Sequence, residues 1–182
     1  VRLDCVVTVP STKPAATSCD AAAPCEVPTT SGTMIGNACV VTDTEPDLAD
    51  SLDGAATAAQ AGDTVLIRQG TYSEQLQPNN SGAPGSPITY RSYPGEVVTL
   101  TGSFSPAVIV LEQVAYITIE GLRVEDSRWL EAVNAQQIVF RNNIFLRTPA
   151  SGTTGNVRFV SSDYNVIAGN IFSRLVYIDL EG

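Results

Sequence analysis

The sequence predicts an all-β protein built as a parallel β-helix, a solenoid of stacked strands, preceded by one helix and a segment held by disulfides. The segments "IVFRNNIF" and "NVIAGNIF", which end at Phe145 and Phe172, echo one another and, more distantly, "ITIEGLRV", which ends at Val124. From residue 63 onward, short β-branched and aromatic runs are separated by Gly, Asn, Pro and Ser, which are strand and turn signals. All four cysteines lie in the first 39 residues.

The cysteine-rich segment 1–43 is the first predicted region. Its Pro, Thr, Ser and Ala residues offer little apolar material for a core, so covalent staples would contribute most there. We expect two disulfides and therefore export, either to the cell exterior or to a periplasmic or cell-surface location. A zinc site is the rival interpretation, but the chain has no histidine and no C-x-x-C pair. The spacing leaves all three pairings open among Cys5, Cys19, Cys25 and Cys39.

The second predicted region, 44–182, begins with the single helix that the sequence indicates, over residues 44–61. Thr44 and Asp47 have the spacing of a capping box, and Pro46 suits the first helical turn. Gly62 ends the pattern. The apolar face of this helix would consist of Leu48, Leu52, Ala55, Ala56 and Ala59.

The echoing segments continue in register over a wider stretch of the chain. Aligning Val124, Phe145 and Phe172 gives spacings of 21 and 27 residues. Two sets of strands keep a fixed offset of ten residues while the total period varies, as in a solenoid whose insertions enter only one of its turns. The same register aligns Ile119, Phe140 and Ile167 in one set, and Ile109, Leu130 and Val157 in the other.

A Gly or Asn residue marks one corner of each predicted coil. Gly121, Asn142 and Gly169 coincide in the alignment, and Gly and Asn accept positive φ at the lowest cost. The next position holds Asn143 and Asn170 on successive coils. We expect these two side chains to stack and hydrogen-bond along the solenoid, as structural residues.

Composition excludes several classes of function. The formal net charge is −9, with nine arginines and one lysine, so nucleic acid and anionic membranes would be repelled. No apolar run is long enough to span a bilayer. The absence of histidine rules out Ser-His-Asp and Cys-His catalysis within this chain.

Three stretches carry a resemblance to a known family: "AGDTVLIRQGTYSEQLQPNNSGAPGSPITYRSYPGEVVTLTG", "YITIEGLRVEDS" and "DYNVIAGNIFSR". They resemble the N-terminal coils of right-handed parallel β-helix proteins of the pectate-lyase-like superfamily, and are particularly similar to polysaccharide lyases of the alginate-lyase and chondroitinase-B kind. The resemblance covers roughly residues 47 to 182. It implies a right-handed β-helix, an N-terminal end capped by the 44–61 helix, and action on uronate-containing polysaccharide by β-elimination.

Strand alternation places a group of polar side chains on the outside of one predicted sheet. The resemblance implies that substrate grooves lie along such a face. There Arg158 would neutralise a uronate carboxylate or act as base, and Tyr177 would donate the proton to the leaving oxygen. Trp129 and Glu131 would contact the glycan. Alternatively, Glu131 and Asp179 would hold a calcium ion.

Other interpretations of the same residues stay open. Glu131, Arg158 and Asp179 also fit a solvated salt-bridge ladder, and Trp129 also fits core packing. The related lyases commonly use lysine, but Lys13 lies in the cysteine-rich segment. The alternative function is therefore a non-catalytic β-helix that binds carbohydrate, adheres or self-assembles. Because "LVYIDLEG" ends the sequence without a capping segment, we expect further coils, a second chain or end-to-end self-association at the C-terminal coil.

Overall fold

The computed structural model describes most of the chain after residue 51 and a few strands outside it. Side chains are described for residues 52–102, 107–147 and 157–173, and the backbone alone for 4–8, 32–35, 38–42 and 178–181. Within these ranges, the chain forms three sheets of mostly parallel strands and one short helix.

Each sheet is built from strands contributed by successive coils. Sheet A contains, in spatial order, β15 (Val166–Ala168), β12 (Val139–Arg141), β9 (Ile117–Glu120), β6 (Ile88–Ser92), β4 (Thr64–Ile67), β1 (Asp4–Thr8), β3 (Ala38–Thr42) and β2 (Gly32–Ile35). Sheet B contains β16 (Ile171–Phe172), β13 (Ile144–Leu146), β10 (Arg123–Glu125), β7 (Val98–Leu100) and β5 (Gly70–Tyr72). Sheet C contains β17 (Ile178–Glu181), β14 (Val157–Val160), β11 (Leu130–Val133) and β8 (Ile109–Glu112).

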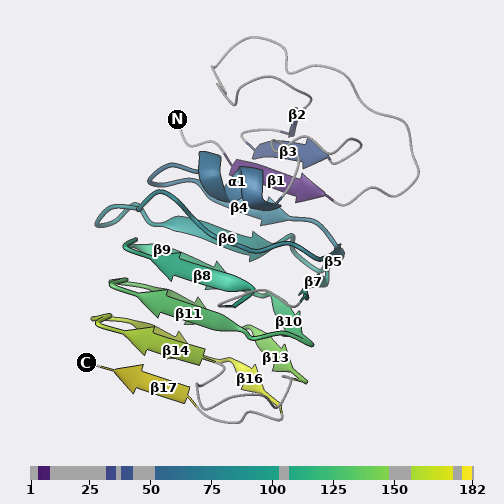
Figure 1. Ribbon diagram of the computed structural model, residues 1–182. Helices are drawn as coiled ribbons and strands as arrows, with labels where there is room; N and C mark the ends of the chain where they lie inside the picture. Colours follow the sequence, from purple (N-terminus) through teal and green to yellow (C-terminus); the bar gives the residue numbers. More distant parts are fainter. Residues whose placement is uncertain are drawn as a thin grey trace.

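The chain visits sheets A, B and C in turn, and each circuit stacks on the one before (Figure 1). The prediction of an all-β, solenoid-like fold is therefore confirmed. The predicted register is confirmed as well. Phe145 lies opposite Val124 on one side and Phe172 on the other, and Leu130 lies between Ile109 and Val157.

The core fills the space that the three sheets enclose. Inward positions of successive coils are buried, with Ile119 and Phe145 fully enclosed. The rings of Phe145 and Phe172 stack with centroids 4.9 Å apart, and Trp129 packs 5.1 Å from Phe145. Because parallel pairing places equivalent side chains above one another, each coil extends one continuous apolar column.

The corner between sheets A and B has the conformation that its Gly and Asn residues predict. Gly121, Asn142 and Gly169 have φ of 70°, 56° and 64°. The next residue on successive coils forms a hydrogen-bonded column. Asn143 Oδ1 accepts from the Leu122 amide at 2.9 Å, and Asn170 Oδ1 accepts from both the backbone amide and the Nδ2 of Asn143, at 2.8 and 3.0 Å.

The helix α1 (Leu52–Ala58) buries the apolar face that the sequence predicts. Leu52, Ala55, Ala56 and Ala59 are all buried. Its last residue is Ala58, earlier than predicted, while most of the predicted first turns, including the Thr44–Asp47 capping box, lie outside the described residues.

A distant loop caps both ends of α1. Glu74 Oε2 accepts a hydrogen bond from the Leu52 amide at 2.8 Å, and Asn80 Nδ2 donates to the carbonyls of Thr57 and Ala59 at 2.9 Å. These contacts satisfy backbone groups that a helix leaves unpaired at its ends. A seven-residue helix is marginal by itself, so this loop holds it on the solenoid.

Sheet A continues past the N-terminal boundary that the sequence predicts at residue 43. Strand β1 pairs in parallel with both β4 and β3, so strands from residues 4–42 extend the sheet beyond the coil that contains β4. Cys5 and Cys39 lie in β1 and β3, but the side chains of all four cysteines are outside the described residues. The two disulfides stay a prediction.

Candidate functional site

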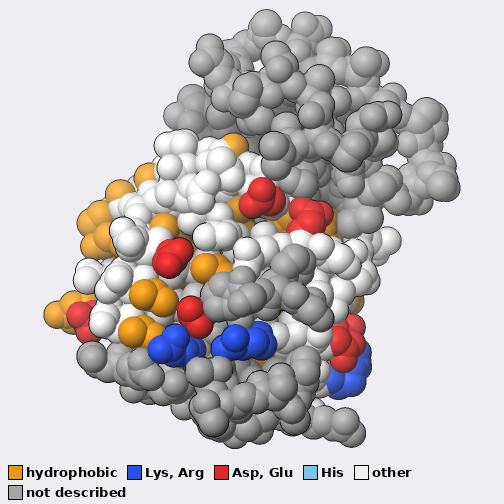
Figure 2. Space-filling model, viewed as in Figure 1, with side chains coloured by type: hydrophobic (Ala, Val, Ile, Leu, Met, Phe, Trp, Pro, Cys, Tyr) orange, Lys and Arg blue, Asp and Glu red, His pale blue; other side chains and the backbone are white. Residues whose placement is uncertain are grey.

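The outer face of sheet C carries the residues that the sequence singles out. Parallel pairing aligns Val110, Glu131, Arg158 and Asp179 in one row across β8, β11, β14 and β17. A second row, two residues further along each strand, consists of Glu112, Val133, Val160 and Glu181. Acidic, basic and apolar side chains therefore lie close together on this face, as Figure 2 shows.

Glu131 and Arg158 form the central contact of the face. Arg158 Nη1 lies 3.5 Å from Glu131 Oε2, and the two side chains are 25% and 16% exposed. Partial burial limits the screening of this pair by water and holds the guanidinium in place. Arg158 is therefore a partly buried cation whose charge Glu131 partly neutralises.

Asp179 lies next to Arg158 in the register, on the side away from Glu131. Its side chain is outside the described residues, as is the whole of Tyr177. The predicted proton donor therefore stays a prediction. The register shows only that the backbone of β17 brings position 179 to the same row.

The row also bears on the predicted calcium site. Glu131 and Asp179 are two strands apart, about 10 Å by the usual strand spacing, and Arg158 lies between them. A calcium ion bound by both carboxylates would have to displace the guanidinium. Within the ranges that the structure describes, no group of three or more acidic, His or Cys residues is arranged to hold a metal.

Trp129 is a core residue in this structure, which favours the packing alternative over the sugar platform. The side chain has no exposed surface and contacts Phe145 and Phe172, with ring centroids 5.1 and 5.9 Å away. Strict alternation would place it outside, because Leu130 points inward. It instead immediately precedes β11, at the corner from sheet B, where the chain turns and alternation no longer applies.

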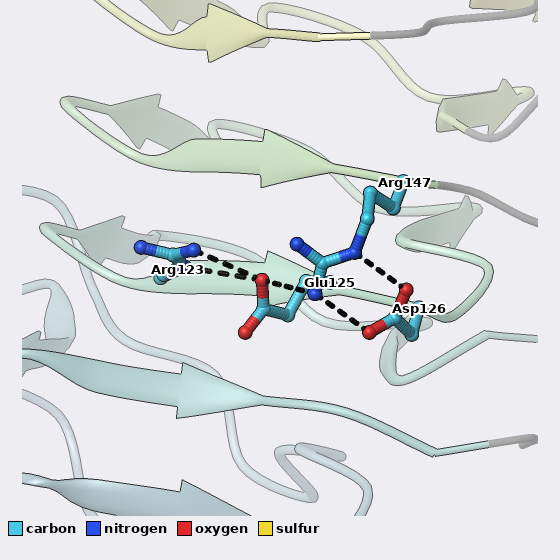
Figure 3. Close-up of polar contacts among 4 residues, drawn as sticks. All are labelled: Arg123, Glu125, Asp126 and Arg147. Atoms are coloured by element: carbon cyan, nitrogen blue, oxygen red, sulfur yellow. Dashed lines mark hydrogen bonds and ion pairs between the residues drawn. The ribbon is translucent and has the colours of Figure 1, made fainter.

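A network of four charged residues, not identified from the sequence, lies at the corner between sheets B and C (Figure 3). Arg147 donates to both carboxylate oxygens of Asp126, at 2.9 and 2.8 Å, and to Glu125 at 2.8 Å. Arg123 donates to the same Glu125 oxygen at 3.1 Å. The hydrogen bonds from Arg147 lower the pKa of Asp126, and Asp126 in turn raises the pKa of Arg147.

The network is electrically balanced, with two cations and two carboxylates. Its arginines are therefore committed to neighbouring acids and are poor candidates for an anion-binding site. A similar pair joins Arg141 Nη2 to Glu120 Oε2 at 2.9 Å on the outside of sheet A. The Arg141 side chain is 50% exposed, twice the exposure of Arg158, so the sheet C pair is the better shielded of the two.

Comparisons with known proteins add one partial similarity. The chain is 38% identical over 82 residues to the uncharacterized protein YwoF of Bacillus subtilis (strain 168). The matched stretch is 42% of this chain and 18% of that protein. No family model matches the chain, and no solved structure matches it. No helix in the described ranges has the length and apolar character that a bilayer crossing needs.

Proposed function

We propose that this chain is a secreted, right-handed parallel β-helix that binds uronate-containing polysaccharide across the outer face of sheet C. The proposal depends mainly on the position of Arg158. Among the outward register positions of the four described strands of sheet C, Arg158 is the one cation, and it is partly buried rather than extended into solvent. A guanidinium held in this way pairs with a carboxylate in two parallel hydrogen bonds.

Glu131 is the main obstacle to this binding and therefore a sensitive test of it. A ligand carboxylate has to compete with Glu131 for the guanidinium, and the neighbouring acids of the face repel it. Glu131→Gln removes the competitor and keeps the shape of the side chain. We expect this variant to bind acidic glycans more tightly; weaker binding would assign the ligand contact to Glu131 instead of Arg158.

The experiment is a panel of alginate, polygalacturonate, chondroitin and dermatan, with calcium or with chelator. Affinity electrophoresis measures binding, and ultraviolet absorbance follows any unsaturated product. Retention by an acidic glycan supports the proposal. A rise in absorbance would add β-elimination, with Arg158 as cation or base and Tyr177 as proton donor. A folded chain that binds none of the panel would contradict the proposal.

A further inference from the structure

The corner that joins sheet C to sheet A, which we call the C–A corner, repeats a left-handed backbone on each coil. It comprises residues 113–116, 134–137 and 161–164 on three successive coils. The first and last residue of each segment are left-handed, and none is glycine. Their φ values are 55° and 56° for Gln113 and Tyr116, 51° and 56° for Asn134 and Gln137, and 47° and 56° for Ser161 and Tyr164.

This conformation has an energetic cost that glycine would avoid. A residue with a side chain is disfavoured by roughly 1–2 kcal/mol in the left-handed region, whereas glycine adopts it freely. At the corner between sheets A and B, the equivalent requirement is met by Gly121, Asn142 and Gly169. Strained positions that keep large side chains are concentrated at functional sites. We infer that the side chains of the C–A corner are retained for what they contact.

The side chains of this corner repeat in columns along the solenoid. Tyr116, Gln137 and Tyr164 each precede by two residues the paired positions Thr118, Val139 and Val166, so they are in register. Successive members lie about 4.8 Å apart along the stacking direction. Two members of the column are exposed, Tyr164 (77%) and Gln137, and Tyr116 is partly buried.

The backbone beneath the column is held in place by hydrogen bonds between coils. The Tyr116 amide donates to the Gln136 carbonyl at 3.1 Å, and the Gln137 amide donates to the Asp163 carbonyl at 3.1 Å. The amides of Ala135 and Ile138 donate to the side chains of Ser162 and Asn165 on the next coil. A ligand would therefore meet a preformed row of side chains, with little ordering required.

The chemistry of the corner indicates the class of ligand. Tyrosine presents a flat apolar ring with a polar tip, and Gln and Asn amides both donate and accept hydrogen bonds. Asp163 is the one charged residue among the twelve, and the corner has no cation. An anionic polymer would therefore find no counter-charge there. We propose that the C–A corner binds an uncharged linear polysaccharide that lies along the solenoid axis, with its sugar rings stacked on the tyrosines.

This proposal is independent of the uronate site on sheet C. A linear chain of sugars suits the corner because equivalent positions recur once per coil along the solenoid axis. Each coil would then meet an equivalent sugar, and hydroxyl groups would pair with Gln113, Asn134 and Gln136 beside the column. Because the same contacts repeat on three coils, their individually weak contributions combine into a higher overall affinity.

The test is binding of the whole chain to soluble xyloglucan, galactomannan and hydroxyethyl cellulose, by affinity electrophoresis and calorimetric titration. We expect at least one neutral glycan to bind. Tyr164→Ala should weaken that binding about tenfold, the effect of removing an aromatic anchor, whereas Tyr164→Phe should retain it. Tyr93→Ala is the control, because Tyr93 is also an exposed tyrosine but follows β6 at the corner between sheets A and B.

Two results would overturn the proposal: a folded chain that binds none of the neutral glycans, or a Tyr164→Ala variant that binds them as well as the parent. Thermal unfolding of each variant establishes that it is folded. Arg158→Ala separates the two sites. It should leave neutral-glycan binding unchanged, and a loss of that binding would place the ligand on sheet C instead of the corner.

Discussion

Two corners of this solenoid meet the same backbone requirement with different sets of residues. The corner between sheets A and B, the A–B corner, turns through Gly121, Asn142 and Gly169, and beside them the buried Asn143 hydrogen-bonds to the partly buried Asn170. The C–A corner turns through left-handed Gln, Asn, Ser and Tyr residues whose side chains are mostly exposed. The first corner has hydrogen-bond partners within the fold, whereas the second is the one that we propose contacts a ligand.

The largest effect is expected from Asn143→Leu at the A–B corner. Asn143 is 1% exposed, accepts from the Leu122 amide and donates to the Ile119 carbonyl at 3.0 Å. Leucine leaves both backbone groups buried and unpaired, so the free energy of unfolding should fall by about 2–3 kcal/mol. Urea unfolding measures this change. An unchanged midpoint would remove the column from the account of stability.

A smaller loss is expected from Gly169→Ala. Gly169 has φ of 64°, and an added Cβ would lie 2.5 Å from Asn142 Oδ1. The conformational cost and the close contact together should lower stability by about 1–2 kcal/mol. Gly85→Ala is the control, because Gly85 has φ of 73° and no atom within 4 Å of the added Cβ. Equal losses in both variants would mean that packing contributes nothing at Gly169.

At the C–A corner, we expect a substitution by glycine to raise stability instead of lowering it. Gln137→Gly relieves the left-handed strain but adds conformational entropy to the unfolded chain, so the melting temperature should rise by an amount equivalent to no more than about 1 kcal/mol. Scanning calorimetry on the parent and the variant makes the comparison. A clear loss of stability would show that the Gln137 side chain is structural, and the contrast between the two corners would fail.

At the A–B corner of the first coils, a glutamate accepts the backbone hydrogen bond that an asparagine accepts further along the chain. Glu96 Oε2 accepts from the Gln69 amide at 2.7 Å, as Asn143 accepts from Leu122 further along. The hydrogen bond from Arg68 lowers the pKa of Glu96 below its usual 4.5. A lowered folded-state pKa means that the stabilisation is complete above the unfolded value and is lost as the pH falls below 4.5 through the folded value.

The expected effect is small, because Arg68 is 36% exposed and its pairing is screened by water. Stability should decline by less than about 1 kcal/mol from this pair as the pH falls from 6 to 3. Glu96→Gln should show a correspondingly flatter dependence of unfolding free energy on pH. Parallel curves for parent and variant would show that Glu96 does not titrate with folding.

The sequence was sufficient to predict which residues lie side by side where the structure repeats with a fixed register. The spacings of 21 and 27 residues predict the pairing of Val124, Phe145 and Phe172, and from it the asparagine column. The same spacing of 21 places Asp126 beside Arg147, so the register of the repeat contains a signal for the charge network as well. Register alone identifies neighbours of this kind.

Other features lacked a local signal. Trp129 turns inward because it lies at a corner, where alternation no longer determines direction. Gln and Tyr have no preference for left-handed backbone, so nothing in their identity predicts the C–A corner. The capping of α1 by Glu74 joins residues 22 positions apart through a contact that depends on the assembled fold. Each of these features depends on tertiary structure rather than on pattern.

The most direct test of the proposed function compares two arginines in the same kind of pair. Arg158 on sheet C faces Glu131, and Arg141 on sheet A faces Glu120. Calorimetric titration of the parent, Arg158→Ala and Arg141→Ala with an acidic oligosaccharide from the panel measures the contribution of each. We expect Arg158→Ala to abolish binding, and any lyase activity, with thermal stability nearly unchanged, while Arg141→Ala binds as the parent does. Equal binding by Arg158→Ala and the parent would contradict the proposed function.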